Sequence, residues 1–177
     1  MSYSSVVRVM REQALKILWA PWRMSYVVKG SAEECIFCKA VRGGDEENYV
    51  VLRSEHTIAM LNIFPYNTAH VMVAPARHVA RIEQLTREEV LDLFEVLSKI
   101  IKAIDAEYAP QGYNIGVNMG RVAGAGVESH IHVHVVPRWL GDTNFMPVIA
   151  GTKVMPEDLR STYTRLRSRV LSQGIAR

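Results

Sequence analysis

The chain has 177 residues, of which 49% are hydrophobic and 22% are charged, and its formal net charge is +3. This length fits one well-filled domain with terminal extensions and leaves little room for a second domain. The charge lacks the dense basic stripe of a duplex-binding protein, so we expect no nucleic-acid duplex as a partner. No apolar run reaches the ~18 residues of a membrane span and no secretory signal pattern follows Met1, so we expect a cytoplasmic protein.

The first 30 residues are predicted to form an extension of the core. Residues 6–18 have the pattern of an amphipathic helix, and we expect the aromatic segment 19–26 to pack on the domain or on a partner subunit. We therefore divide the chain into an N-terminal helix and aromatic arm (1–30), a central domain (31–150) and a C-terminal helical extension (151–177).

Both cysteines, Cys35 and Cys38, stand in one C-x-x-C motif. In a reducing cytosol this spacing indicates a metal or redox site and not a structural disulfide. A thioredoxin-like pair begins a helix directly after a core strand, whereas this pair follows a polar loop. A knuckle that turns both thiolates toward one ion fits this context better. Two sulfurs leave tetrahedral Zn²⁺ short of two ligands, which histidines can supply.

Short apolar runs between turn residues predict the strands of one sheet. In chain order these runs are residues 49–53, 57–63, 70–75, 113–118 and 130–137. Because most of them follow one another without helical crossovers, we expect an antiparallel sheet of about five strands in an α+β fold.

Two helices are predicted around this sheet. A capping box from Thr86 to Glu89 opens the longer one, which we expect to lie on the sheet. Its apolar stripe consists of Val90, Leu93, Phe94, Leu97, Ile100, Ile101 and Ile104. Pro156 and the helical period of the apolar residues after it predict a C-terminal helix.

Three of the six histidines alternate in one apolar run, as His130, His132 and His134. On a β-strand these side chains share one face and lie roughly 6–7 Å apart. A half-exposed strand with incidental polar residues is the plain alternative, although Thr, Lys or Glu would serve equally well there. Because neutral imidazole is a common metal ligand, base and nucleophile, the pattern indicates a site of chemistry.

With these motifs in place, the sequence resembles the histidine triad (HIT) superfamily of nucleotide hydrolases and transferases. The resemblance extends from about Trp19 to about Leu166 and includes the segment from Asn62 to Val73. Residues 136–145 are similar to the branch that includes diadenosine polyphosphate phosphorylases. The resemblance implies a HIT-like fold and an enzyme that cleaves nucleoside phosphoanhydrides, with dinucleoside polyphosphates as candidate substrates.

The resemblance also implies a division of work among the histidines. His132 would attack the α-phosphorus and form a covalent nucleotidyl-histidine, which splits one difficult step into two. The other ring nitrogen of His132 must then be held by an acceptor, so that the attacking nitrogen is unprotonated. His134 would contact phosphate oxygens or the leaving group. His70 would support them, although a purely structural histidine is an equal alternative.

Several further residues are implied to bind the nucleotide. Asn62 resembles the residue that binds ribose hydroxyls. The Gly-rich loop 118–127 feeds into the triad, and glycines let main-chain N–H groups approach phosphate closely. Many relatives carry Gln or Ser four residues before the triad, where this chain has Gly126. The phosphate contacts would then come from the main chain at Gly124, Ala125 and Gly126 and from Asn118. A plain hairpin loop is the alternative, and Trp139 fits a nucleotide contact or the core equally well.

The resemblance completes the metal site and indicates an oligomer. In zinc-bearing relatives the C-x-x-C pair is joined by two histidines, which correspond here to His78 and His130. Four protein ligands indicate a closed structural zinc site without a bound catalytic water. Family members are commonly homodimers.

Two classes of function stay open at this point. The first is an enzyme that transfers the nucleotide to water or to inorganic phosphate, or acts as an adenosine phosphoramidase. The second is a zinc-organised nucleotide-binding protein with little turnover.

Overall fold

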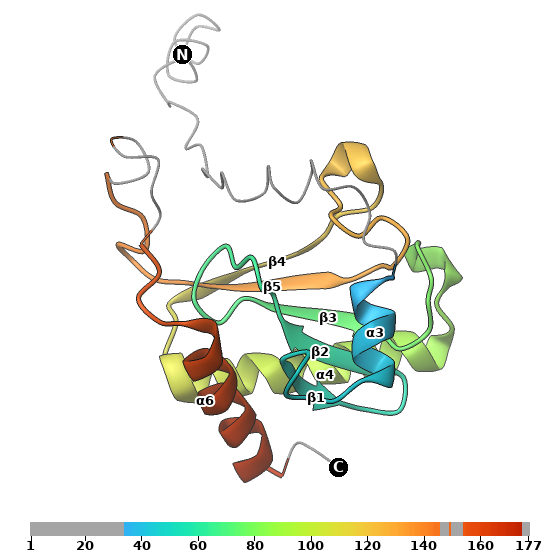
Figure 1. The fold of residues 1–177 in the computed structure, drawn as a ribbon, viewed down its shortest axis with the longest axis horizontal. Coiled ribbons are helices and arrows are strands. Elements are labelled where there is room, and N and C mark those ends of the chain that lie inside the picture. The colour runs from blue at the N-terminus through green and yellow to red at the C-terminus, as the bar shows by residue number, and fades with distance from the viewer. Residues whose placement is uncertain (1–33, 146–148, 150–153, 175–177) are drawn as a thin grey trace, which may run out of the picture.

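The computed structural model describes residues 34–145, 149 and 154–174. The N-terminal helix and aromatic arm expected before residue 31 lie outside this part. Five strands form one antiparallel sheet in the order β1-β2-β3-β5-β4, with helices on both faces (Figure 1). The α+β expectation is confirmed. The strands are β1 (Val50–Arg53), β2 (Thr57–Leu61), β3 (Val71–Pro75), β4 (Gly112–Val117) and β5 (Val133–Arg138).

The helices described are α3 (Ile36–Arg42), α4 (Arg87–Tyr108) and α6 (Leu159–Ser172), with short 3-10 turns η1 (Ile82–Gln84) and η2 (Arg121–Ala123). None of the helices in the described ranges is long and apolar enough to cross a lipid bilayer.

The last predicted strand begins later than expected. We predicted a strand over 130–137, but β5 begins at Val133, so His130 and His132 precede it. The reason is a competing tertiary contact: the Ile131 N–H donates to the Val79 carbonyl, in the loop after β3, at 2.7 Å. The sheet ladder between β3 and β5 forms only from Val133 onward.

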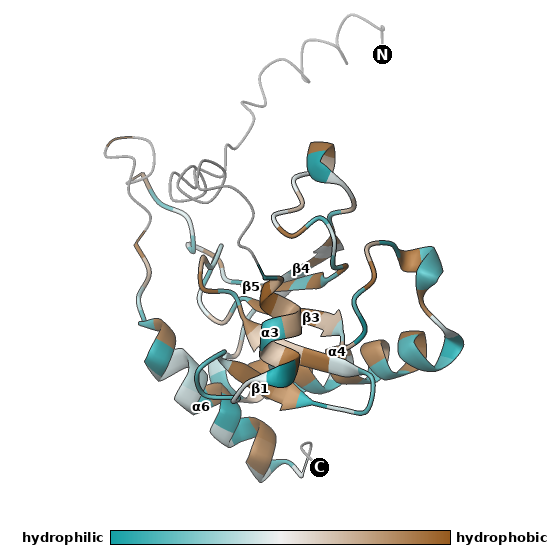
Figure 2. Ribbon diagram, turned by 45° about the vertical axis from the view of Figure 1, so that its right-hand side comes forward, coloured by the Kyte–Doolittle hydropathy of each residue, from teal (hydrophilic) through white to brown (hydrophobic). Residues whose placement is uncertain are grey.

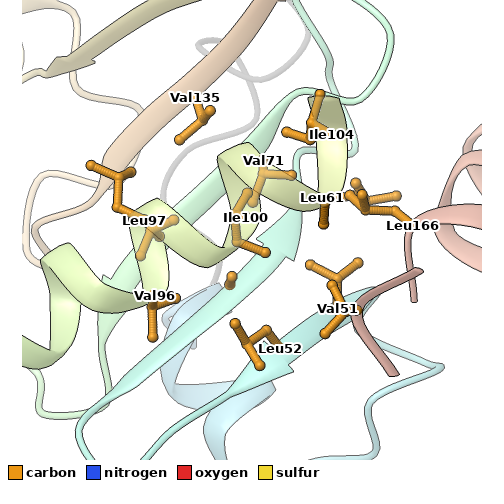
Figure 3. Close-up of a cluster of buried hydrophobic side chains, with 14 of the residues drawn as sticks. Val51, Leu52, Leu61, Val71, Val96, Leu97, Ile100, Ile104, Val135 and Leu166 are labelled. Atoms are coloured by element: carbon orange, nitrogen blue, oxygen red, sulfur yellow. The ribbon is translucent and has the colours of Figure 1, made fainter. Parts of the chain in front are cut away.

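Helix α4 is positioned by its predicted capping box and packs on one face of the sheet. The Thr86 hydroxyl accepts from the Glu89 N–H, and the Glu89 carboxylate accepts from the Thr86 N–H at 2.8 Å. Ile100 and Leu97 face strand residues such as Val71 (Figure 3). Phe94 and Val90, which we placed in this stripe, are 63% and 36% exposed, whereas Val96 and Ala103 are buried in it.

The C-terminal helix α6 shares this core. Its Leu166 and Val170 are fully buried in the same cluster as the α4 stripe. Both helices carry hydrophobic and hydrophilic residues in turn along their length (Figure 2). Helix α6 begins at Leu159 after the cap residue Asp158, three residues later than a start at Pro156.

The short helix α3 lies on the opposite face of the sheet from α4 (Figure 1). Its buried Phe37 and Ala40 form a second apolar cluster with strand residues of β1, β2 and β3. The Arg53 guanidinium at the end of β1 donates to the carbonyls of Ala40, Val41 and Gly43 at 2.6–3.1 Å. These bonds satisfy carbonyls that the end of a helix leaves without partners.

The loop that carries His78 is fastened to the start of α4. The Arg77 guanidinium donates two hydrogen bonds of 2.7 Å to the buried Glu89 carboxylate and one to the Gln84 carbonyl. These hydrogen bonds lower the pKa of Glu89 to about 2. Glu89 therefore fixes both the helix start and the loop before it.

This arrangement predicts a pH-dependent stability. Glu89 has a folded pKa below its ordinary value of 4.5, so its contribution is present above about pH 4.5 and is lost as the pH falls toward 2. We expect Glu89→Gln to lower the free energy of unfolding by about 1–3 kcal/mol at pH 7. The difference from wild type should shrink below pH 4.5 in urea melts. Glu95→Gln, at an exposed position of the same helix, is the control; an equal loss in both variants would contradict this account.

Candidate metal centre and active site

Cys35, Cys38, His78 and His130 converge on one point, although they come from three separate parts of the chain. Each residue offers a ligand atom that lies within 4.8 Å of the other three. The Cys38 sulfur is 3.1 Å from His78 Nδ1, and His130 Nδ1 is 3.4 Å from the Cys35 sulfur and 3.7 Å from that of Cys38. Tetrahedral zinc with bonds of roughly 2.0–2.3 Å separates its ligands by about 3.3–3.8 Å. The set therefore fits a metal ion.

His130 is oriented for this role by its second ring nitrogen. Its Nε2–H donates to the Pro75 carbonyl at 2.8 Å, which leaves Nδ1 unprotonated and directed at the two sulfurs. Burial lowers the pKa of His130 to about 4, which favours the neutral ring that a metal requires. Burial and the neighbouring Cys35 raise the pKa of the Cys38 thiol. A hydrogen-bonded second nitrogen is the usual support of a metal-ligating histidine.

The cysteine pair corrects one expectation. We predicted a loop knuckle, but Cys35 is the N-cap of α3 and Cys38 lies in its first turn. A helix turn brings two residues three positions apart to the same side, so the helix start serves the same purpose as a knuckle. Both thiols are free of a disulfide.

His132 follows the metal cluster directly and is held by it through the backbone. Its Nδ1–H donates to the main-chain carbonyl of His130 at 2.9 Å, so its Nε2 carries the lone pair. The ring is 3% exposed and contacts Phe37 of α3 at a centroid distance of 4.8 Å. Burial lowers the pKa of His132, which favours the neutral imidazole.

His134 and His70 form a hydrogen-bonded pair beside His132. The rings of His132 and His134 are 4.8 Å apart, and His70 Nε2 is 3.0 Å from His134 Nδ1. The Tyr66 N–H donates to His70 Nδ1 at 3.1 Å, so the neutral His70 ring carries its proton on Nε2 and donates it to His134. A neutral His134 then has its own proton on Nε2.

Asn62 and Trp139, two further residues expected to bind the nucleotide, have different surroundings in the structure. Asn62 lies 3.4 Å from His70 Nδ1 through its amide nitrogen, and its amide oxygen accepts from the Phe64 N–H, so the side chain supports the turn as well. Trp139 is tied to the end of α4, because its indole N–H donates to the Tyr108 carbonyl at 3.2 Å. This contact favours the structural alternative for Trp139 over a nucleotide contact.

The Gly-rich loop has the backbone form that its glycines allow. Gly120 and Gly124 adopt positive φ values of 81° and 87° on either side of η2. A side chain on Gly124 would lie 4.0 Å from the Asn118 amide nitrogen, so the loop folds back on this residue. Gly126 and Val127 lead into the triad, and Val127 packs on the cluster of Phe37.

Sequence reasoning missed the Tyr66 ring beside His134 and the ion pair of Arg138 and Asp142 near it. The Tyr66 ring lies 4.6 Å from that of His70 and 5.6 Å from that of His134. Beyond it, Arg138 and Asp142 form a two-pronged ion pair at 2.6 and 3.0 Å. The Asn67 amide donates to the same carboxylate at 2.8 Å. The four-residue spacing of Arg138 and Asp142 is the signal that was available in the sequence.

Comparisons with known proteins give the family. A model of the HIT domain matches residues 44–139. The chain is 40% identical over 157 residues to AP-4-A phosphorylase of Mycobacterium tuberculosis (strain CDC 1551 / Oshkosh), a match covering 84% of this chain and 80% of that protein. It is 29% identical over 136 residues to adenosine 5'-monophosphoramidase hnt1 of Schizosaccharomyces pombe, covering 77% and 98%.

A solved structure agrees with this match. A zinc-bound histidine triad family protein of Mycobacterium smegmatis has a TM-score of 0.62 and 26% identity to this chain, covering 80% of this chain and 96% of that one. The domain model covers more than half of the sequence and contains the alternating histidines. The chain therefore belongs to the HIT domain family.

Proposed function

We propose that this chain cleaves dinucleoside polyphosphates at the α-phosphorus through a covalent nucleotidyl-His132 intermediate. One observation carries the proposal: the His132 Nδ1–H is donated to the His130 carbonyl at 2.9 Å, so the Nε2 lone pair is available. A histidine that only binds a nucleotide has no need of this fixed tautomer. The name of the 40% identical relative, AP-4-A phosphorylase, supports the choice of substrate.

The chemistry then runs in two displacements. In the first, His132 Nε2 forms a bond to the α-phosphorus while the bond to the bridging oxygen breaks and the leaving polyphosphate keeps the electron pair. The Nε2 proton of His134 can be donated to that oxygen, because its Nδ1 accepts from His70. In the second, an acceptor attacks the same phosphorus and releases His132.

Inorganic phosphate is the acceptor that we propose, supported again by the name of the Mycobacterium tuberculosis relative. Diadenosine tetraphosphate plus phosphate would give ATP plus ADP, whereas water would give ATP plus AMP. The 29% identical phosphoramidase makes cleavage of a nucleoside phosphoramidate the second candidate activity. Contacts to the nucleotide are proposed for Asn62, Asn118 and the main chain at residues 124–126.

We propose zinc as the ion of the Cys₂His₂ set, supported by the donor types and spacing and by the zinc-bound Mycobacterium smegmatis structure. Bound zinc would hold His130, and through its carbonyl the tautomer of His132. A reducing cytoplasm, which keeps Cys35 and Cys38 as thiols, is the location that we propose.

We also propose a homodimer, with residues 31–150 as the domain that makes the contact. Helix α4 contacts β2 and β3, and α6 contacts β1. At β4, α4 meets the start of the strand, where the Tyr113 hydroxyl donates to the Ile101 carbonyl and to the Asp105 carboxylate. Ile115 and Val117 on this edge strand are 46% and 37% exposed, and Phe94 on the outer side of α4 is 63% exposed. An exposed edge strand beside an apolar helix face suits a symmetric contact with a second copy.

The covalent step is tested by rapid quench into alkaline denaturant with diadenosine tetraphosphate labelled at the α-phosphate. We expect wild-type protein to carry acid-labile label on one histidine and His132→Ala to carry none and turn over at least 10³-fold more slowly, because the nucleophile is lost. His56→Ala, which changes a half-exposed histidine in the turn between β1 and β2, is the control. A wild-type protein that binds the dinucleotide without adduct or turnover would favour the nucleotide-binding alternative.

The metal is tested by elemental analysis of purified protein. We expect one zinc per chain in wild type and in His56→Ala, and far less in His78→Ala and Cys38→Ser, because each removes one of four ligands. His78→Ala and Cys38→Ser should also lose activity. Full activity in protein free of zinc would refute the positioning role of the metal.

The dimer is tested by light scattering after size exclusion. We expect wild type at twice the 20.0 kDa mass of one chain and Phe94→Glu at the mass of one chain, because a charge would be buried in the contact. Leu140→Glu, at an apolar position just beyond β5 that is 88% exposed, should stay dimeric. A monomeric wild type, or a dimeric Phe94→Glu, contradicts this contact.

A further inference from the structure

A cavity of about 220 Å³ opens beside the histidines on the same face of the sheet. Tyr66 links the two, since its ring lines the cavity and lies 5.6 Å from the ring of His134. Val136 and Arg138, two and four residues beyond His134 on β5, also line it. Because alternate residues of a strand share a face, the cavity continues the row of triad side chains.

Among the described residues, the way from His134 to this cavity passes over Gly116. Gly116 of β4 pairs with His134, and the described residues put nothing within 4 Å of the place a side chain on Gly116 would occupy. The next pair along, Asn114 and Val136, already belongs to the cavity lining. A substrate chain can therefore cross above Gly116 without meeting a side chain from that position.

The in-line geometry of nucleotidyl transfer relates the place of this cavity to the leaving part of the substrate. In a phosphoryl transfer the attacking and leaving atoms lie roughly in line with the phosphorus between them. With His132 attacking, the leaving group departs away from His132. His134 and the cavity residues Val136 and Arg138 follow His132 along the chain, on the side opposite His130 of the Cys₂His₂ cluster. The leaving portion of the substrate is thus carried toward this lining.

The lining has the chemistry of a nucleoside site. The Arg138 charge is compensated by Asp142 through two hydrogen bonds of 2.6 and 3.0 Å, and the carboxylate would repel a phosphate group. Tyr66 offers an aromatic face and Val136 an apolar one. Within the described ranges, the Asn114 amide nitrogen and the Thr143 hydroxyl make no hydrogen bond, so both can serve a base or a ribose. The volume is below the ~300–1,000 Å³ of sites for whole drug-sized ligands, which suits one fragment.

We propose that this cavity binds the second nucleoside of the dinucleotide, the one that leaves with the polyphosphate, and so selects dinucleoside polyphosphates over nucleotides with one nucleoside. The inference rests on the proposed function and specifies its substrate class. It assigns specificity contacts to Asn114 and Thr143.

Three substrates with the same transferred nucleotide test the proposal: diadenosine tetraphosphate, adenosine 5'-tetraphosphate and adenosine 5'-phosphoramidate. They differ only in what leaves. We expect wild type to have a lower KM for diadenosine tetraphosphate than for adenosine tetraphosphate. Asn114→Ala and Thr143→Val should each lower the ratio of kcat/KM between these two substrates about five- to tenfold, through KM and not kcat. Thr164→Val, on the exposed side of α6, should keep the wild-type ratio.

Results that contradict the nucleoside assignment differ from those that contradict the proposed function. Equal kcat/KM for the two tetraphosphates in wild type, or an equal loss on both in the variants, would overturn the nucleoside assignment. A wild-type protein that cleaves none of the three would instead overturn the proposed function. Thermal unfolding of each variant separates a folding defect from a loss of binding, and a folded Thr143→Val with the wild-type ratio would contradict the proposal.

Discussion

The hydrogen bond from His132 Nδ1 to the His130 carbonyl is the interaction on which the rest of the site depends. His130 has two connections at once: its ring completes the Cys₂His₂ cluster and its main chain fixes the neighbouring nucleophile candidate. A backbone carbonyl is a permanent acceptor, so it sets the tautomer of His132 without any titrating partner. The Cys₂His₂ cluster and the His132 ring are therefore parts of one rigid unit.

This unit stands where several elements meet. Helix α3 supplies Cys35 and Cys38 and presses Phe37 against both His130 and His132, at centroid distances of 5.0 and 4.8 Å. The loop after β3 supplies His78 and is tied to α4 through Arg77. The sheet core beneath is filled by α4 and α6. Substituting one residue of the Cys₂His₂ cluster would thus be felt at His132 through packing as well as through the His130 backbone.

Much of this site could be predicted from the sequence because its signals are local. The C-x-x-C spacing, the capping box of Thr86 and Glu89 and the alternating histidines each report on neighbours along the chain. The helical start at Cys35 and the late start of β5 were missed, because a helix turn can replace a knuckle and because Ile131 pairs with Val79, which is 52 positions away. The pairing of His70 with His134 and the cavity beside them were also not predicted, because both form only once β3, β4 and β5 are side by side.

The most direct test of the account is the ¹⁵N NMR spectrum of the histidine side chains in the metal-loaded protein at neutral pH, with His132 assigned by comparison with His132→Gln. The account predicts a neutral His132 ring with its proton on Nδ1 and an unprotonated Nε2, in slow exchange with water because the ring is buried. A proton on Nε2, or on both ring nitrogens, would contradict it, since His132 would then have no lone pair for attack.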